Sequence, residues 1–167
     1  MRAGPTLLLL LLAGCGEARR GVDYDALRNA ELESARVPGG RLTLVDGTYE
    51  ASTGDGPGER VRVVARGEAL GDVDRDGVTD GVLVLATTAG SGGTFLELVL
   101  VVERANRATH AASAPLGERL QLEGVAVEET GVVRVDVREA APDGARSDPS
   151  ERTTRRFAFR AGALVEG

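Results

Sequence analysis

Alternating apolar and polar positions recur along the chain after residue 35 and predict a protein built mainly from β-strands. In the segment from Arg60 to Ala65, Val61 and Val63 share one face while Arg60 and Arg62 take the other. Successive side chains of a strand point to opposite faces, so this segment predicts a strand with one buried face. The same reasoning gives about eight strands. They cover residues 41–45, 48–50, 60–65, 82–86, 95–102, 119–128, 133–138 and 155–160.

Two of these segments are apolar at nearly every position. Residues 82–86 and 95–102 contain one charged side chain, Glu97. Such runs are typical of strands that are covered on both faces. The Gly-rich segment Thr87 to Thr94 predicts a hairpin tip, and Asp46-Gly47 predicts another hairpin. Short connections of this kind favour an antiparallel sheet, arranged as a sandwich or a partly closed barrel.

Other segments carry a weaker pattern. Asp23 to Ser34 fits a short helix capped by Asp23 or Asp25, although its C-terminal half fits an edge strand equally well. Asn106 to Pro115 is polar and Ala-rich, and we expect it to be a connection. Glu139 to Arg152 has no apolar period, so we expect a mobile loop there. Gly124 separates two alternating stretches of opposite phase, which predicts a β-bulge.

Residues 71–85 (GDVDRDGVTDGVLVL) place four carboxylates within nine positions and lead directly into an apolar run. Calcium takes roughly 6–8 oxygen ligands, and a central glycine permits the sharp turn that brings alternate carboxylates to one point. The spacing therefore predicts a Ca²⁺ site, with a water molecule completing the shell. The expected ligands are the side chains of Asp72, Asp74, Asp76 and Asp80 and the backbone carbonyl of Val78.

This loop resembles the D-x-D-x-D-G-x-x-D calcium loop of FG-GAP and integrin-type β-propeller repeats, in which the loop joins two strands. Leu83 stands where an EF-hand has its bidentate Glu, so Asp80 would close the site. A propeller needs several copies of about 40–50 residues, and this motif occurs once. The alternative is an Asp-rich turn without an ion. Mutual repulsion of four clustered carboxylates favours the ion.

The first residues form an apolar leader. A positive start at Arg2 precedes six consecutive Leu, and the segment ends in Leu12-Ala13-Gly14-Cys15. This resembles the lipobox of bacterial lipoproteins, which implies cleavage before Cys15 and attachment of acyl chains such as palmitate. The implied organisation is a signal peptide at 1–14, a lipidated Cys and tether at 15–22, and one β-rich domain at 23–167. An ordinary secretory signal followed by a chance Cys is the alternative.

The resemblance also implies a location. Gly16 is not the Asp that holds many such lipoproteins at the inner membrane, so we expect a lipid anchor in the outer membrane, facing the periplasm or the cell surface. The D-G-x-Y-E hairpin, the acidic loop and the Gly-rich hairpin follow the same order in a set of uncharacterised bacterial secreted proteins and lipoproteins. That likeness implies an envelope protein and assigns no activity.

Charge and composition limit the classes of partner that the protein is expected to bind. The net charge is −6, and no basic run is interleaved with aromatic residues, which argues against a nucleic-acid partner. The densest positive cluster, formed by Arg152, Arg155 and Arg156, is interpreted as a solvated strand face. Cys15 is the sole Cys, so an intramolecular disulfide is excluded. The sequence does not predict an oligomeric state.

We expect a non-catalytic lipoprotein that binds an envelope protein or a glycan and carries one structural calcium ion. A carboxylate-dependent hydrolase is the alternative, with a pair drawn from Glu97, Glu123, Glu128 and Asp136. Glu97 would need a raised pKa for that role, but we expect its face to open to water. His110 is the only His, and Ser113 is near it only in sequence. A hydrolase inhibitor that uses the 139–152 loop is a third reading.

Overall fold

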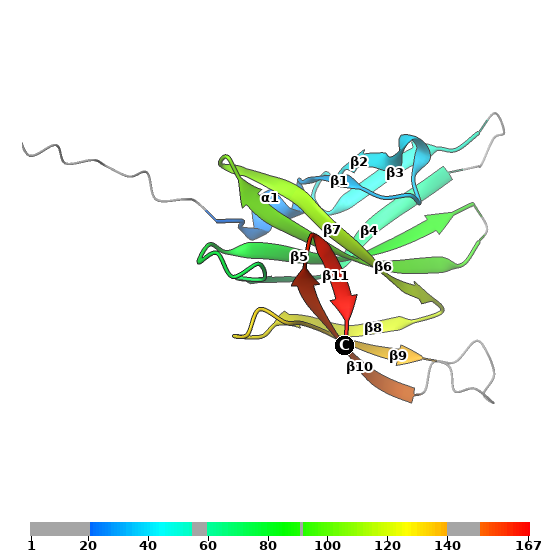
Figure 1. Cartoon of the computed structure of the whole chain (residues 1–167). Coiled ribbons are helices and arrows are strands. Elements are labelled where there is room, and N and C mark those ends of the chain that lie inside the picture. Colours follow the sequence, from blue (N-terminus) through cyan, green and yellow to red (C-terminus); the bar gives the residue numbers. More distant parts are fainter. Residues whose placement is uncertain (1–20, 55–59, 91, 140–150) are drawn as a thin grey trace, which may run out of the picture.

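β-strands dominate the part of the chain that the computed structural model describes, which comprises residues 21–54, 60–90, 92–139 and 151–167 (Figure 1). The elements in chain order are α1 (Tyr24–Arg28), β1 (Glu31–Glu33), η1 (Pro38–Gly40), β2 (Arg41–Thr43), β3 (Thr48–Ser52), β4 (Arg60–Gly71), β5 (Asp80–Ala89), β6 (Thr94–Arg104), β7 (Arg107–Glu118), β8 (Gln121–Val127), β9 (Val133–Glu139), β10 (Glu151–Arg160) and β11 (Ala163–Glu166).

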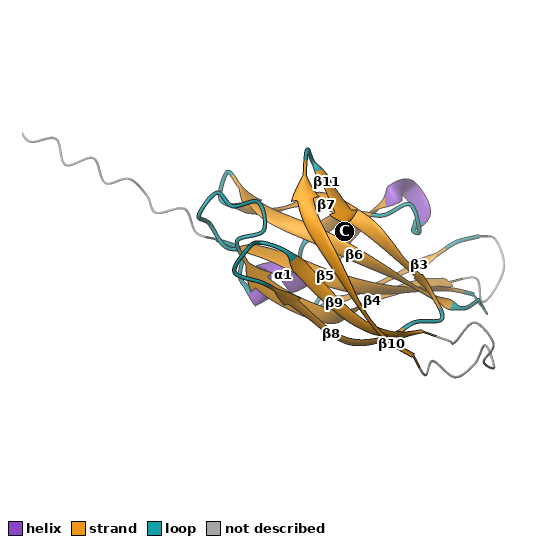
Figure 2. Cartoon of the chain, turned by 60° about the horizontal axis from the view of Figure 1, so that its bottom comes forward, coloured by secondary structure: helices purple, strands orange, loops and turns teal. Residues whose placement is uncertain are grey.

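The strands form three antiparallel sheets. The largest has the order β3-β4-β5-β6-β7, the second has the order β11-β10-β9-β8, and β1 pairs with β2 in a small third sheet. In the described residues β8 packs against β4 and β11 against β7, so the two larger sheets face each other (Figure 2). The predicted mainly β, antiparallel fold is confirmed, and a sandwich rather than a closed barrel fits it.

Two apolar cores hold the sheets together. The first lies between the two larger sheets and includes the fully buried Val84, Leu98 and Val135. The second lies on the opposite face of the five-stranded sheet, where Leu27 of α1 packs against Leu83. Neighbouring residues of β5 therefore belong to different cores. This confirms that the apolar run after the acidic loop is covered on both faces.

Every described side chain of both cores lies within residues 22–164. Among the described residues, the apolar interior therefore begins at Val22. The predicted signal peptide and Cys15 lie outside the described residues. Among the residues that are described, none of the helices is long and apolar enough to cross a membrane.

The N-terminal segment contains both elements that its sequence suggested. Asp23 caps α1, because its Oδ1 accepts a hydrogen bond of 2.8 Å from Ala26 N. The chain then enters β1, which pairs antiparallel with β2. Together, α1, β1 and β2 form the cover over the second core.

The Asp46-Gly47 turn is present, but the hairpin predicted around it is wrong. Both residues have positive φ, 49° and 78°, as a tight two-residue turn requires. Only a single bridge, Val45 to Thr48, closes it. The flanking strands separate at once, since β2 pairs with β1 and β3 pairs with β4. Tertiary pairing in the two different sheets overrides the local turn signal.

The expectation that Asn106 to Pro115 is a polar connection is also wrong, because residues 107–118 form the strand β7. Ala112, Ala114 and Leu116 alternate along it and are buried in the first core. Small Ala side chains carry little hydrophobic signal, so the alternation is weak in the sequence. The short strand β11 was also not predicted.

The C-terminal half of the sandwich follows the predicted pattern. Val133, Val135 and Val137 are fully buried, as is Phe157, and Phe159 packs partly buried against the same core. The ladder between β8 and β9 shifts register between Leu122 and Gly124, which confirms the predicted bulge. Most of the expected 139–152 loop, residues 140–150, lies outside the described residues.

Candidate metal site

The acidic loop joins β4 to β5. These strands are antiparallel neighbours, and their last ladder pair is Gly71 with Asp80. The loop therefore starts and ends at fixed, adjacent points of the sheet. Asp80 is the first residue of β5, so its position is set by the sheet and not by the loop alone.

Hydrogen bonds between side chains and amides curl the loop inward. Gly77 N donates to Asp72 Oδ2 at 3.0 Å, Asp76 N to Asp74 Oδ1 at 3.1 Å, and Val78 N to Asp76 Oδ1 at 2.9 Å. Gly77 has φ of 83°, the left-handed conformation that the sequence predicted a glycine must supply. The alternating carboxylates are thus held by backbone amides of the same bend.

Asp80 is the buried member of the group, with an exposed fraction of 1%. Its Oδ2 accepts hydrogen bonds from Val73 N at 2.9 Å and from Asp74 N at 3.1 Å. Burial raises its pKa from 3.8 to about 6, and the two amide bonds oppose that rise without cancelling it. An ionised Asp80 is therefore costly unless a cation faces it.

Three carboxylates converge in the loop. Asp72, Asp74 and Asp80 each offer one oxygen, and these oxygens all lie within 4.8 Å of one another, so that the group can hold a metal ion. Burial, followed by the charges of Asp76 and Asp72, raises the pKa of Asp74. In addition, Asp72 Oδ1 is buried and has no hydrogen-bond partner among the described residues. A cation at this point would supply what that oxygen lacks.

Two of the predicted ligands, Asp76 and the Val78 carbonyl, are not among the three converging carboxylates. Asp76 is not a member of the converging group. Its Oδ1 is held by Val78 N, and its charge raises the pKa of the neighbouring Asp74. Ligation through the Val78 carbonyl stays a prediction.

The loop also contacts three separate parts of the fold. Val73 inserts into the first core. The backbone of Gly131, in the turn between β8 and β9, lies so close that an added Cβ would stand 3.0 Å from the Asp72 carbonyl oxygen. On the other side, Val22 N donates a 2.7 Å hydrogen bond to Thr79 O. An ion in this loop would therefore stiffen a junction of both sheets and the N-terminal segment.

The only His does contact a Ser and an acid. His110 Nε2 lies 2.9 Å from Ser113 Oγ, and His110 Nδ1 lies 4.0 Å from Glu33 Oε2. A register shift in β7 between these residues places both on the face that β1 covers. Burial lowers the pKa of His110, against the opposing charges of Glu33 and Glu97. This favours a neutral imidazole that links β1 to β7.

Glu97 lies on the same covered face. Its Oε2 accepts a 2.9 Å hydrogen bond from Ser34 Oγ, and Ser34 is itself buried with an exposed fraction of 5%. The expectation that Glu97 simply opens to water is therefore wrong, because the segment after β1 lies over it. The contact ties this segment to β6.

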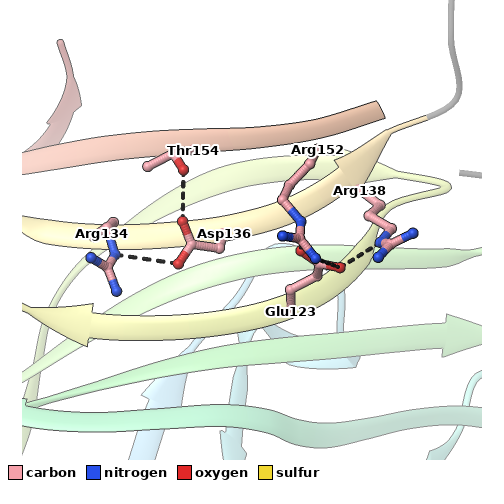
Figure 3. Close-up of polar contacts among 6 residues, drawn as sticks. All are labelled: Glu123, Arg134, Asp136, Arg138, Arg152 and Thr154. Atoms are coloured by element: carbon pink, nitrogen blue, oxygen red, sulfur yellow. Dashed lines mark hydrogen bonds and ion pairs between the residues drawn. The ribbon is translucent and has the colours of Figure 1, made fainter. Parts of the chain in front are cut away.

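Two carboxylates of the hydrolase reading, Glu123 and Asp136, lie on the outer face of the four-stranded sheet (Figure 3). Glu123 is bound by Arg138 and by Arg152, and these hydrogen bonds, that from Arg138 above all, lower its pKa. Asp136 accepts a 2.7 Å hydrogen bond from Thr154 Oγ1 and lies 3.3 Å from Arg134 Nε. Carboxylates neutralised by arginines in this way are poor general acids or bases.

The predicted arginine cluster is divided between two environments. Arg152 and Arg156 are exposed and pair with Glu123 and Glu128, as a solvated strand face requires. The interpretation as a solvated face is wrong for Arg155. Its side chain is only 16% exposed and donates a hydrogen bond of 2.6 Å to the carbonyl oxygen of Leu116. It connects β10, an inner strand of the four-stranded sheet, to β7, an edge strand of the five-stranded sheet.

The three converging carboxylates of the loop, one of which has a buried oxygen without a partner among the described residues, could hold a metal ion. Among the described residues, the other buried side-chain atom without a hydrogen bond is Arg134 Nε, which lies 3.3 Å from Asp136 Oδ2. No protein-family model, no curated protein and no solved structure matches the chain, so its function rests on these residues and their geometry.

Proposed function

We propose that this chain is a cell-envelope lipoprotein whose β-sandwich is stabilised by one calcium ion and serves as a binding module. The observation that carries the calcium site is the pairing of a fully buried carboxylate, Asp80, with a buried and unpartnered oxygen on Asp72. Each is costly alone, and one cation between them offsets both costs.

The donor set favours calcium over other metals. Its donors are carboxylate oxygens, without a Cys or His ligand, which suits hard cations and not zinc or copper. Loop carbonyls such as that of Val78, together with water, would complete a shell of roughly 6–8 oxygens. Magnesium demands tighter octahedral geometry, so a loop built on flexible turns suits calcium better.

The envelope location is supported by the sequence. The lipobox-like Leu12-Ala13-Gly14-Cys15 and the apolar leader support lipid attachment at Cys15 and an outer-membrane anchor. The chain enters the folded domain soon afterwards, since Val22 is already buried. The intervening residues, 15–21, span about 25 Å at most when extended, which would hold the domain beside the bilayer.

Thermal unfolding of the chain from Gly21 to Gly167, with calcium and with EGTA, tests the ion. Calcium at 100 times its dissociation constant is expected to add about 2.7 kcal/mol of stability. Asp74→Ala should lose that gain, and Asp25→Ala, an exposed acidic residue of α1, should keep it. A melting temperature that changes with neither calcium nor EGTA would reject the site.

The anchor has its own test in the full chain. Expressed in a diderm bacterium, the protein should fractionate with outer membranes, and mass spectrometry should find acyl chains on the peptide that begins at Cys15. Cys15→Ser should move the protein out of the membrane fraction. Membrane association that survives this substitution would reject the lipid anchor.

A further inference from the structure

A cavity of about 430 Å³ opens where the chain passes from β7 to β8 and so from one large sheet to the other. This volume is within the roughly 300–1,000 Å³ of small-molecule sites. The cavity uses none of the residues of the acidic loop.

The floor and walls of this cavity are aliphatic. Ala86 and Leu96, which are ladder partners in β5 and β6, are buried members of the first core. Leu120 and Leu122 pack against that core but stay partly exposed. The two leucines therefore leave apolar surface uncovered beside the interior of the sandwich. An apolar chain of a ligand would complete their burial.

A single charge stands at the rim. Arg66 is the residue at which the β4–β5 ladder shifts register, between Ala65 and Gly67. Such a bulge re-aims a side chain, and here Arg66 lines the cavity. Arg66 forms no ion pair or hydrogen bond with any residue that the structure describes. Four positions earlier on the same strand, Arg62 is paired with Glu50 at 3.1 Å.

The bulge also brings the opposite wall close. A Cβ added at Gly67 would lie 2.8 Å from Leu122 Cδ2, so only glycine lets β8 approach β4 at this point. Gly67 and Arg66 therefore act together: one admits the leucine wall and the other supplies the unpaired cation. The polar groups of Thr94 and Gln121 complete the rim.

We propose that this cavity binds a single-chain amphipathic anion of the fatty-acid class. The carboxylate would pair with Arg66, and the alkyl chain would lie over the exposed parts of Leu120 and Leu122. The lining contains no aromatic ring on which a sugar could stack, and no carboxylate that would favour a cation. The proposal goes beyond the calcium loop and the lipid anchor and depends on neither.

Titration of the chain from Gly21 to Gly167 with sodium decanoate, followed by amide NMR below the micellar concentration, tests this site. The amides of Ala86, Leu96 and Leu122 should shift and saturate together. Hexanoate should bind at least tenfold more weakly, because each buried methylene contributes about 0.8 kcal/mol. Decyltrimethylammonium should not bind there.

The matched variants are Arg66→Gln and Arg62→Gln, two exposed arginines of one strand. Arg66→Gln should weaken decanoate binding about fivefold, as expected for a charge contact near the surface of about 1 kcal/mol. Arg62→Gln should leave binding unchanged. The proposal is overturned if decanoate does not bind, or if the shifts gather at exposed apolar residues elsewhere. It is also overturned if both variants bind decanoate as tightly as the wild type does and the wild type binds decanol, the uncharged analogue, equally tightly.

Discussion

Replacing Asp80 by Asn separates the two opposite effects that this buried carboxylate has on stability. Asn retains an oxygen that can accept the hydrogen bonds from Val73 N and Asp74 N, and it removes the charge. Without an ion, the charge destabilises the folded state, because burial raises the pKa of Asp80 from 3.8 to about 6. With an ion, the same charge is a ligand.

The magnitude follows from that shift. Each pKa unit corresponds to about 1.36 kcal/mol, so ionising Asp80 in the metal-free fold costs about 3 kcal/mol at neutral pH. The folded state binds this proton more tightly than the unfolded state does. Its contribution therefore makes metal-free stability fall as the pH rises from about 4 to about 6, with no further fall above that range.

The assay is urea unfolding of the chain from Gly21 to Gly167, read by circular dichroism. At pH 7 in EGTA, Asp80→Asn should be more stable than the wild type by up to about 3 kcal/mol. In saturating calcium the order should reverse or the gap should close, because only the wild type gains the ion. Between pH 4 and 7 in EGTA, the difference between the two proteins should grow with pH.

Three results would refute this reasoning. If Asp80→Asn is less stable than the wild type in EGTA, the carboxylate is not a burden in the metal-free fold. If it gains as much from calcium as the wild type does, Asp80 is not a ligand. If neither protein gains stability from calcium, the loop is an acidic turn without an ion.

Three further changes test other parts of the molecule. Gly77→Ala should cost about 1 kcal/mol in a thermal melt, because its φ of 83° strains a residue with a Cβ; no loss of stability would contradict the loop conformation. Leu98→Ala, at a fully buried position between the sheets, should cost about 2–5 kcal/mol in urea unfolding, and a cost below about 1 kcal/mol would place Leu98 outside the core. His110→Gln should flatten stability between pH 7 and 5: the lowered pKa of His110 means that its contribution is present above about 6.5 and is lost as the pH falls. An unchanged pH profile would contradict a buried neutral imidazole.

Strands rich in Val and Leu were predictable because burial and alternation coincide in them. In β9 every second residue is Val and is fully buried. The strand β7 has a weak pattern because Ala112 and Ala114 bury little area and the polar His110 and Ser113 stand near them. Sequence alone likewise gave the Asp46-Gly47 turn but not its strand partners, which depend on contacts between distant segments.

The candidate sites also differ in whether local sequence or contacts between distant segments determine them. The convergence of Asp72, Asp74 and Asp80 was predictable, because the spacing, one glycine and the pairing of the two strands that the loop joins bring these side chains together. The contact between His110 and Ser113 was not, since residues three apart on a regular strand face opposite ways and only a bulge aligns them. The cavity beside Arg66 depends on how two sheets meet, which has no signature in the sequence of either strand.

The hydrogen bond from Val22 N to Thr79 O gives the acidic loop a mechanical position in the molecule. Thr79 directly precedes Asp80, so tension on the chain from its N-terminal side reaches the folded domain at the rim of the carboxylate group. Pulling on the N-terminus would therefore load this hydrogen bond, and with it the residue beside Asp80, directly.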